Sequence, residues 1–129
     1  MNHRTMTHIL NKWCNKYYVT RIFEYKDGVH IILCRNHWIV LYVENDIVDF
    51  FDSYGRSPIH FRIRLKNKCV NNYSKYLQNK ESNVCGYYCL AFVYMRLQNR
   101  LEQYFQMFND DKILNDKKVV HFVNMLIKK

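Results

Sequence analysis

The sequence has no apolar run long enough to cross a lipid bilayer, and it begins with polar, mixed residues instead of a signal peptide. It also has no internal repeat, no low-complexity segment and no linker. These absences argue against a membrane protein and a multidomain chain, so we predict one domain spanning residues 1–129. Hydrophobic residues make up 49% of the chain, and 11 Tyr, 8 Phe and 2 Trp predict a largely aromatic core.

The five cysteines have neither the even number nor the regular spacing of a disulfide framework. Without a secretion signal, we interpret them as reduced thiols of an intracellular protein. Two pairs, Cys34 with His37 and Cys85 with Cys89, have spacings that a metal site can use. Zinc sites usually combine two clear pairs, whereas here one pair falls in a strand pattern and the other in a helical pattern. We therefore predict no metal site, and we interpret Cys89 as a core residue.

Acidic residues are missing altogether between positions 53 and 80, although the chain carries 11 of them against 20 Lys and Arg, for a net charge of +9. We call residues 53–80 the acid-free segment. Its basic residues are Arg56, Arg62, Arg64, Lys66, Lys68, Lys75 and Lys80. Such a strip attracts polyanions, with nucleic acid as the first candidate, and we expect Arg56, Arg62, Arg64, Lys66 and Lys68 to contact it. A solvated surface without a partner explains the composition equally well.

Hydropathy periodicity predicts a mixture of helices and strands. Apolar residues at helical spacing indicate helices over residues 7–17, 85–99, 101–108 (separate from the preceding helix or continuous with it) and a last one capped by Asn115 or Asp116. Strand patterns cover residues 19–25, 29–33, 38–43, 47–51, 59–65 and 71–77. The alternation over 59–65 is typical of an edge strand with a basic outer face, and a loop or a short helix is the alternative there.

Cys85 stands between a polar, turn-forming run and an apolar, helix-like run. A thiol in the first turn of a helix lies near unpaired backbone N–H groups and the positive end of the helix dipole, which lower its pKa. Gly86, one of only three glycines, removes a side chain where a substrate backbone can approach. Gln78 and the N–H of Cys85 are candidate donors to an oxyanion.

His37 and Asp52 lie at the two ends of a predicted hairpin, because the first strand begins at His37 and the second ends at Asp52. Antiparallel pairing makes these ends neighbours. Asp49 is a second candidate carboxylate, but it points to the opposite face of its strand. Taken singly, the three residues have ordinary explanations: a hydrogen-bonded core histidine for His37, a turn residue for Asp52, a packing thiol for Cys85. Together they form the set that a cysteine protease needs.

The order of these residues resembles that of the adenovirus protease (adenain) family, with relatives in Polinton/Maverick-type elements and other DNA viruses. The wider clan includes the SUMO-deconjugating proteases. The likeness extends over about half of the chain, roughly residues 29–96. It rests on His37-Trp38, Phe50-Phe51-Asp52-Ser53-Tyr54-Gly55, Gln78 and Cys85-Gly86.

The resemblance implies an α+β, papain-like core in which a mixed sheet packs against a central helix carrying the cysteine, with further helices beside it. It also implies that Cys85, His37 and Asp52 form the catalytic triad and that Gln78 and Cys85 form the oxyanion hole. Cleavage would follow small residues, often at glycine-containing sites. Position 52 is Asp where adenain has Glu, as is usual in the SUMO-protease branch, and the chain is shorter than adenain.

The leading hypothesis is a monomeric viral cysteine endopeptidase that processes virion precursor proteins in the host nucleus or the virion. It requires no cofactor, although the resemblance allows stimulation by DNA. Adenain is also helped by a peptide disulfide-linked to a cysteine, and here we expect Cys69 not to serve in that way. The alternatives are a deubiquitinase or deSUMOylase acting on host conjugates, and a non-catalytic basic binding module of the same fold.

Overall fold

The computed structural model describes residues 1–128, in which one α-helix is followed by five strands and then by three α-helices. The helices are α1 (His3–Trp13), α2 (Cys85–Leu97), α3 (Leu101–Gln106) and α4 (Lys112–Ile127), with a short 3₁₀ helix at Pro58–Phe61. The strands are β1 (Tyr17–Thr20), β2 (Gly28–Cys34), β3 (His37–Glu44), β4 (Ile47–Phe51) and β5 (Cys69–Asn72). This is an α+β fold, as expected from the sequence.

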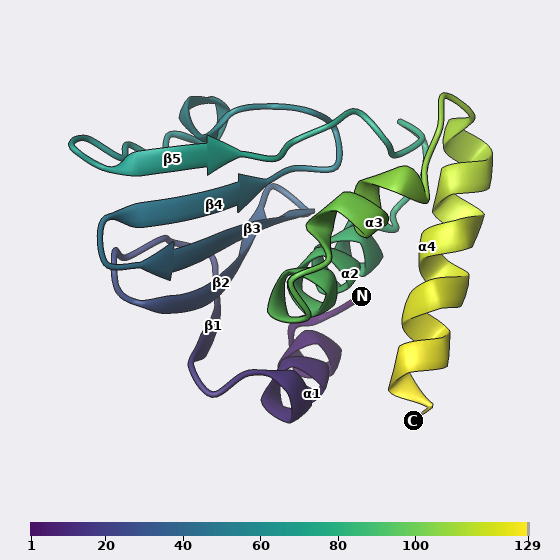
Figure 1. Cartoon of the computed structure of the whole chain (residues 1–129), viewed down its shortest axis with the longest axis horizontal. Coiled ribbons are helices and arrows are strands. Elements are labelled where there is room, and N and C mark those ends of the chain that lie inside the picture. The colour runs from purple at the N-terminus through teal and green to yellow at the C-terminus, as the bar shows by residue number, and fades with distance from the viewer. Residues whose placement is uncertain (129) are drawn as a thin grey trace.

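The five strands form one mixed sheet in the order β1-β2-β3-β4-β5. The central strands β2, β3 and β4 run antiparallel, while β1 pairs parallel to β2 and β5 pairs parallel to β4. Figure 1 shows the sheet on one side of the molecule and the helices on the other, with α4 outermost. The predicted hairpin between β3 and β4 is therefore present, and it places the end of β4 near the start of β3.

Alternate residues of the central strands enter two separate cores. Ile31 pairs with Val40, and both face the helices, whereas Ile32 pairs with Ile39, and both face the opposite side of the sheet. Phe61 of the 3₁₀ helix and Leu65 of the following loop cover that second side. This arrangement follows from the two-residue period of a strand and explains why β2 and β3 are continuously apolar.

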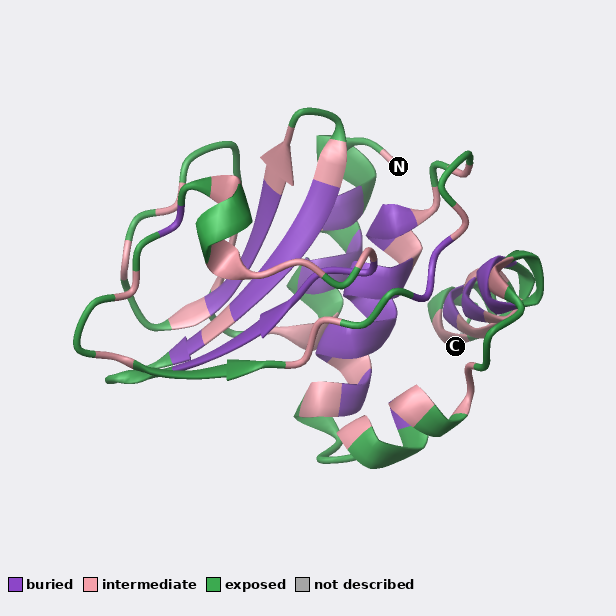
Figure 2. Cartoon of the chain, turned by 90° about the horizontal axis from the view of Figure 1, so that it is seen from above, coloured by how far each residue is buried: buried purple, intermediate pink, exposed green. Residues whose placement is uncertain are grey.

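Helix α2 occupies the centre of the helical layer. Nine of its residues are buried: Cys85, Gly86, Tyr88, Cys89, Leu90, Ala91, Phe92, Val93 and Met95. Figure 2 shows this helix buried on nearly all sides. The ring of Phe92 stacks on Phe51 of β4 with 4.8 Å between centroids, which ties the helix to the sheet. A helix that is apolar around its whole circumference belongs inside a domain, and this position fixes its first turn rigidly.

The strand predicted over residues 59–65 is wrong, and the alternative of a short helix is what forms. Pro58 begins the 3₁₀ helix, and Arg62 ends it in the left-handed region at φ 60°. Proline restricts φ to helical values and is favoured at the first position of a helix, where its missing N–H costs nothing, so a helical turn starts here. The free edge of β4 is occupied instead by β5.

The remaining differences concern the ends of elements. Helix α4 begins at Lys112 and its N-cap is Asp111, whose carboxylate accepts a hydrogen bond from the N–H of Leu114, so neither Asn115 nor Asp116 caps it. Helix α1 begins earlier than expected because Asn2 caps it through the N–H of Thr5. Strands β1 and β5 lie earlier than predicted, and α3 is a separate helix.

Across residues 1–128, none of the helices combines the length and the apolar character needed to cross a bilayer. Within the same described residues, His, Cys, Asp and Glu side chains form no group of three or more that would hold a metal ion. Within this part of the chain, the five cysteines form no disulfide with one another.

Candidate active site

Three predicted site residues stand at the ends of different elements and meet at one place. Cys85 is the first residue of α2, His37 is the first residue of β3, and Asp52 follows directly after β4. A two-residue turn precedes His37, with Arg35 and Asn36 at φ 48° and 64°. Such left-handed pairs are typical of tight hairpins, and this one fixes where β3 begins.

The imidazole of His37 and the carboxylate of Asp52 are directly bonded. Nε2 of His37 lies 2.5 Å from Oδ1 of Asp52, whose side chain is completely buried. The other oxygen, Oδ2, accepts hydrogen bonds from the backbone N–H and from Nε of Arg56, both at 2.9 Å. Burial alone would raise the pKa of Asp52, but the hydrogen bonds from His37 and Arg56 outweigh burial and lower this pKa from 3.8 to about 2. Asp52 is therefore ionised throughout the neutral range.

The imidazole of His37 also interacts with the thiol of Cys85. Because Nε2 is held by Asp52, the nitrogen left for the sulfur is Nδ1. Burial opposes charge on both groups, yet the hydrogen bonds of His37 to Asp52 and Cys85 raise the pKa of His37. The hydrogen bonds from His37 and from the N–H of Trp38, which lies 3.4 Å from Sγ, lower the pKa of Cys85. The two shifts have opposite signs, so both favour a thiolate beside an imidazolium.

Aromatic rings fix the plane of the imidazole. Tyr54 stacks on His37 with 4.9 Å between ring centroids and an interplanar angle of 27°, and Phe61 lies nearly parallel to His37 at 6.2 Å. Asp52 is fixed through its backbone, since its N–H donates to Oγ of Ser74 at 2.8 Å. The histidine therefore has little freedom to turn away from either partner.

Gln78 is buried close to the end of β4 and is held by two serines. Its Oε1 accepts a hydrogen bond from Oγ of Ser53 at 2.6 Å, and its Nε2 donates to the carbonyl and to Oγ of Ser82 at 3.2 and 3.1 Å. Ser82 lies in the loop that leads into Cys85. The amide is thus oriented, with its N–H groups bonded to Ser82, and its role as an oxyanion donor stays a prediction. The N–H of Cys85 lies in the first turn of α2, where backbone donors lack intrahelical partners.

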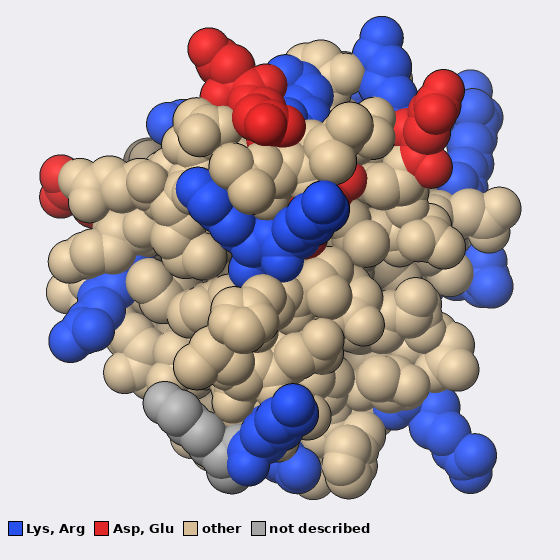
Figure 3. Space-filling view, turned by 90° about the vertical axis from the view of Figure 1, so that its right-hand side faces the viewer, with Lys and Arg blue, Asp and Glu red and all other residues tan. Residues whose placement is uncertain are grey.

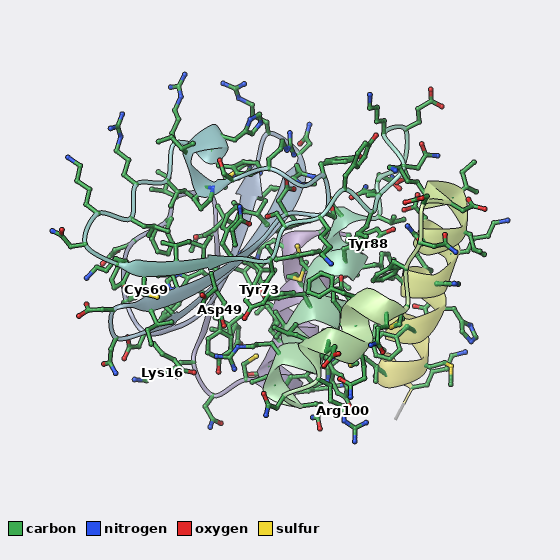
Figure 4. All side chains as sticks on the ribbon, turned by 45° about the horizontal axis from the view of Figure 1, so that its top comes forward. Lys16, Asp49, Cys69, Tyr73, Tyr88 and Arg100 are labelled. Carbon is green, nitrogen blue, oxygen red and sulfur yellow. The ribbon has the colours of Figure 1, made fainter. Side chains whose placement is uncertain are left out.

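Asp49, the alternative carboxylate, does not contact His37. Its two oxygens accept hydrogen bonds from Nε of Arg96 at 2.8 Å and from Nδ2 of Asn71 at 2.9 Å. Figure 4 shows Asp49 near Tyr73, on the part of the sheet next to the helices. Asp49 is therefore part of an ion pair that joins β4 to α2.

The residues predicted to bind nucleic acid divide into two groups. Arg56 is engaged with Asp52 and donates from Nη1 to His60 at 3.1 Å, and Lys68 pairs with Asp46 at 3.0 Å. Arg62, Arg64 and Lys66 are exposed, and none of them forms an ion pair within the described residues. Basic side chains also occur outside the acid-free segment, because the face that carries α4 shows several separate basic groups (Figure 3).

Cys69 lies at the opposite end of the sheet from the site. It pairs with Ile47 at the start of β4, whereas Asp52 follows the end of the same strand. Its thiol is exposed on the edge strand, as Figure 4 shows. A group attached to Cys69 would reach His37 only across the length of β4.

Two hollows flank the His37-Trp38 pair. One has a volume of about 340 Å³ and is lined by Cys34, Arg35, His37, Arg56, His60, Phe61 and Arg62. The other, of about 450 Å³, is lined by His3, Val19, Thr20, Arg21, Ile22, Leu33 and Trp38. A substrate bound over Cys85 therefore has a basic hollow next to the histidine and a more apolar one next to the tryptophan.

Sequence reasoning missed two contacts of this site. The first is the hydrogen bond that the N–H of Trp38 donates to Sγ of Cys85. It has no signal in the sequence, because it depends on how α2 meets β3. The second is the ion pair between Arg56 and Asp52. Gly55 lies between them at φ 80°, and a Cβ there would come within 2.9 Å of the backbone nitrogen of Tyr76. An Asp followed by a glycine turn and an arginine is the pattern that indicates this pair.

No family model, curated protein or solved structure matches the chain.

Proposed function

We propose that this protein is a cysteine endopeptidase with a papain-like arrangement, in which Cys85 is the nucleophile, His37 the acid–base and Asp52 the orienting carboxylate. The observation that carries the proposal is that Asp52 is hydrogen-bonded to His37, while Cys85 accepts a hydrogen bond from the N–H of the adjacent Trp38 and shifts the pKa of His37 as His37 shifts its own. Each role requires a particular neighbour, and each of the three side chains has that neighbour. A buried histidine with only a structural role does not need both a carboxylate and a thiol.

Acylation begins when the thiolate of Cys85 attacks the carbonyl carbon of the scissile peptide bond. An S–C bond forms and the carbonyl oxygen becomes an oxyanion. The N–H of Cys85 and, once released from Ser82, an N–H of Gln78 donate to that oxygen. The imidazolium of His37 then gives its proton to the leaving nitrogen, the C–N bond breaks, and the amine product departs.

Deacylation uses the same groups in reverse. Neutral His37 accepts a proton from a water molecule, and the hydroxide attacks the thioester carbon. The S–C bond breaks, the acid product leaves, and the thiolate and imidazolium are restored. Asp52 stays ionised, because its pKa is about 2, and it stabilises the imidazolium in both steps.

The proposed substrates are virion precursor proteins, cleaved after small residues, as the resemblance to the adenain-like proteases implies. DNA binding by Arg64 and Lys66 is part of the same proposal, since these exposed cations are available to phosphates, whereas Arg62 lines the hollow beside His37. Arg56 and Lys68 are withdrawn from that role because acidic side chains already hold them.

The test is cleavage of the structural proteins encoded beside the gene, with the product ends determined by sequencing. Wild-type protein is expected to produce defined new termini, and Cys85→Ala and His37→Ala to produce none while unfolding at the same denaturant concentration. Cys69→Ala is the matched control, because it removes an exposed thiol far from His37. Cleavage at the wild-type rate by Cys85→Ala would rule the proposal out.

A further inference from the structure

A basic hollow lies directly beside the imidazole of His37. It encloses about 340 Å³, and its lining contains three arginines and two histidines but no acidic residue. The arginines reach it from two segments that are distant in sequence: Arg35 from the hairpin turn before β3, and Arg56 and Arg62 from the connection around the 3₁₀ helix. Tertiary folding therefore concentrates positive charge at one point next to the proposed acid–base.

Two of these guanidinium groups have no ionic partner. Arg35 and Arg62 are exposed and form no ion pair within residues 1–128. The charge of Arg56 is offset by Asp52, which receives both its Nε and its backbone N–H. Nη1 of Arg56 donates to Nε2 of His60, so this nitrogen of His60 acts as an acceptor. The hollow thus presents about two uncompensated positive charges and several N–H donors.

We propose that this hollow binds a carboxylate of the substrate, carried by an aspartate or glutamate immediately after the scissile bond. The inference rests on the proposed function, because it places the group relative to the bond that Cys85 attacks. His37 protonates the leaving nitrogen, so the leaving part of the substrate must lie on the side of His37. The hollow shares His37 in its wall and is therefore next to the first residues of that leaving part.

A protein carboxylate fits this place better than a nucleic acid does. Guanidinium groups bind carboxylates through two parallel N–H donors, and Arg35 and Arg62 have such forks available. A nucleic acid strand laid over the same arginines would cover His37 and block access of a peptide to Cys85. The exposed cations Arg64 and Lys66 are outside the lining of this hollow, so phosphates can be bound there without obstructing the site.

The test compares paired peptides built on a mapped cleavage site. They differ only in glutamate or glutamine directly after the scissile bond, and all have amidated C-termini. Wild-type enzyme is expected to cleave the glutamate peptide with a kcat/KM about tenfold higher, and the preference should shrink as salt is added. Arg35→Gln combined with Arg62→Gln should abolish the preference. Arg64→Gln combined with Lys66→Gln, which removes equal charge outside the hollow, should preserve it.

A second peptide arm identifies the source of the carboxylate. Peptides that end one residue after the scissile bond are offered with a free or an amidated terminus. Faster cleavage of the free form, sensitive to Arg35→Gln with Arg62→Gln, would also support the proposal.

Equal cleavage of all pairs by wild-type enzyme would overturn the proposal while leaving the proposed function intact. Loss of oligonucleotide binding in the same double variant, without any glutamate preference, would overturn it in favour of a phosphate site. If no peptide is cleaved and Cys85 reacts with iodoacetamide as an ordinary thiol, the proposed function itself fails.

Discussion

His37 and Asp52 are joined by a hydrogen bond of 2.5 Å between Nε2 and Oδ1, although fifteen residues separate them in the sequence. The β3–β4 hairpin brings them together, because its antiparallel register pairs Val40 with Phe51 and so carries Asp52 back toward the start of β3. Because this bond occupies Nε2, Nδ1 is the nitrogen of His37 that can serve Cys85. The arrangement of Asp52, His37 and Cys85 therefore results from strand pairing and from the position where α2 begins.

The thiol of Cys85 is expected to react with iodoacetamide at neutral pH much faster than an unperturbed thiol. Its pKa is lowered from 9.0 by the hydrogen bonds of His37 and Trp38, against the effect of burial, so the thiolate persists below the pH range where an ordinary cysteine is protonated. Reactivity should fall only as pH drops through this lowered pKa. The measurement is the alkylation rate against pH, followed by mass spectrometry of the Cys85 peptide.

His37→Gln provides the control for that profile. Without the imidazole, burial dominates, the pKa of Cys85 should rise, and alkylation at neutral pH should become slow. Cys89 is a second internal control, since burial raises its pKa well above 9.0 and it should not react in the folded protein. An identical pH profile in wild type and His37→Gln would show that the two side chains are not coupled.

Asp52 should make the stability of the protein depend on acid pH. Its pKa is lowered in the folded state from 3.8 to about 2, so its contribution is fully present above pH 3.8 and is lost as pH falls toward 2. A shift of this size corresponds to about 2 kcal/mol of unfolding free energy. Urea unfolding of wild type and Asp52→Asn at pH 5 and pH 2 measures it: the difference between the two proteins should shrink at the lower pH. A constant difference would contradict the assignment.

Arg56 should support the carboxylate of Asp52 and not bind DNA. Arg56→Gln removes the Nε donor at 2.9 Å, so the pKa of Asp52 should rise and peptide hydrolysis should slow by about tenfold. Its affinity for oligonucleotides should stay near the wild-type value, whereas Arg64→Gln with Lys66→Gln should reduce that affinity and its salt dependence. Filter binding and peptide kinetics on the same preparations separate the two roles. If Arg56→Gln lost DNA affinity and kept full activity, Arg56 would be a DNA-binding residue instead.

Gln78 should matter for turnover and not for the reactivity of the thiol. Gln78→Ala removes one proposed oxyanion donor and should lower kcat by about 10²-fold, with alkylation of Cys85 unchanged. Ser82→Ala removes one of the two acceptors that hold Nε2 and should have a much smaller effect, because the Ser82 carbonyl remains. Equal losses in the two variants would indicate that Gln78 acts only by holding the loop before α2.

The sequence by itself determined the elements whose signal is local. The apolar runs of β2 and β3, the hairpin to β4 and the helix that begins at Cys85 are all where periodicity and turn residues predict them. The same pattern reading failed over residues 59–65, where an alternating segment forms a 3₁₀ helix begun by Pro58 instead of a strand. Alternating apolar and polar residues indicate which side chains can share a face. They do not indicate whether a neighbouring strand is available for pairing.

Only the tertiary structure decided which side chains meet. Arg56 turns back on Asp52 through Gly55, Gln78 is held between Ser53 and Ser82, and Asp49 pairs with Arg96 of α2. Arg35 and Arg62 share a hollow although they belong to separate turns. These partners depend on how loops close and how α2 packs on the sheet. Long-range packing selects them, whereas local periodicity carries only the information for each element.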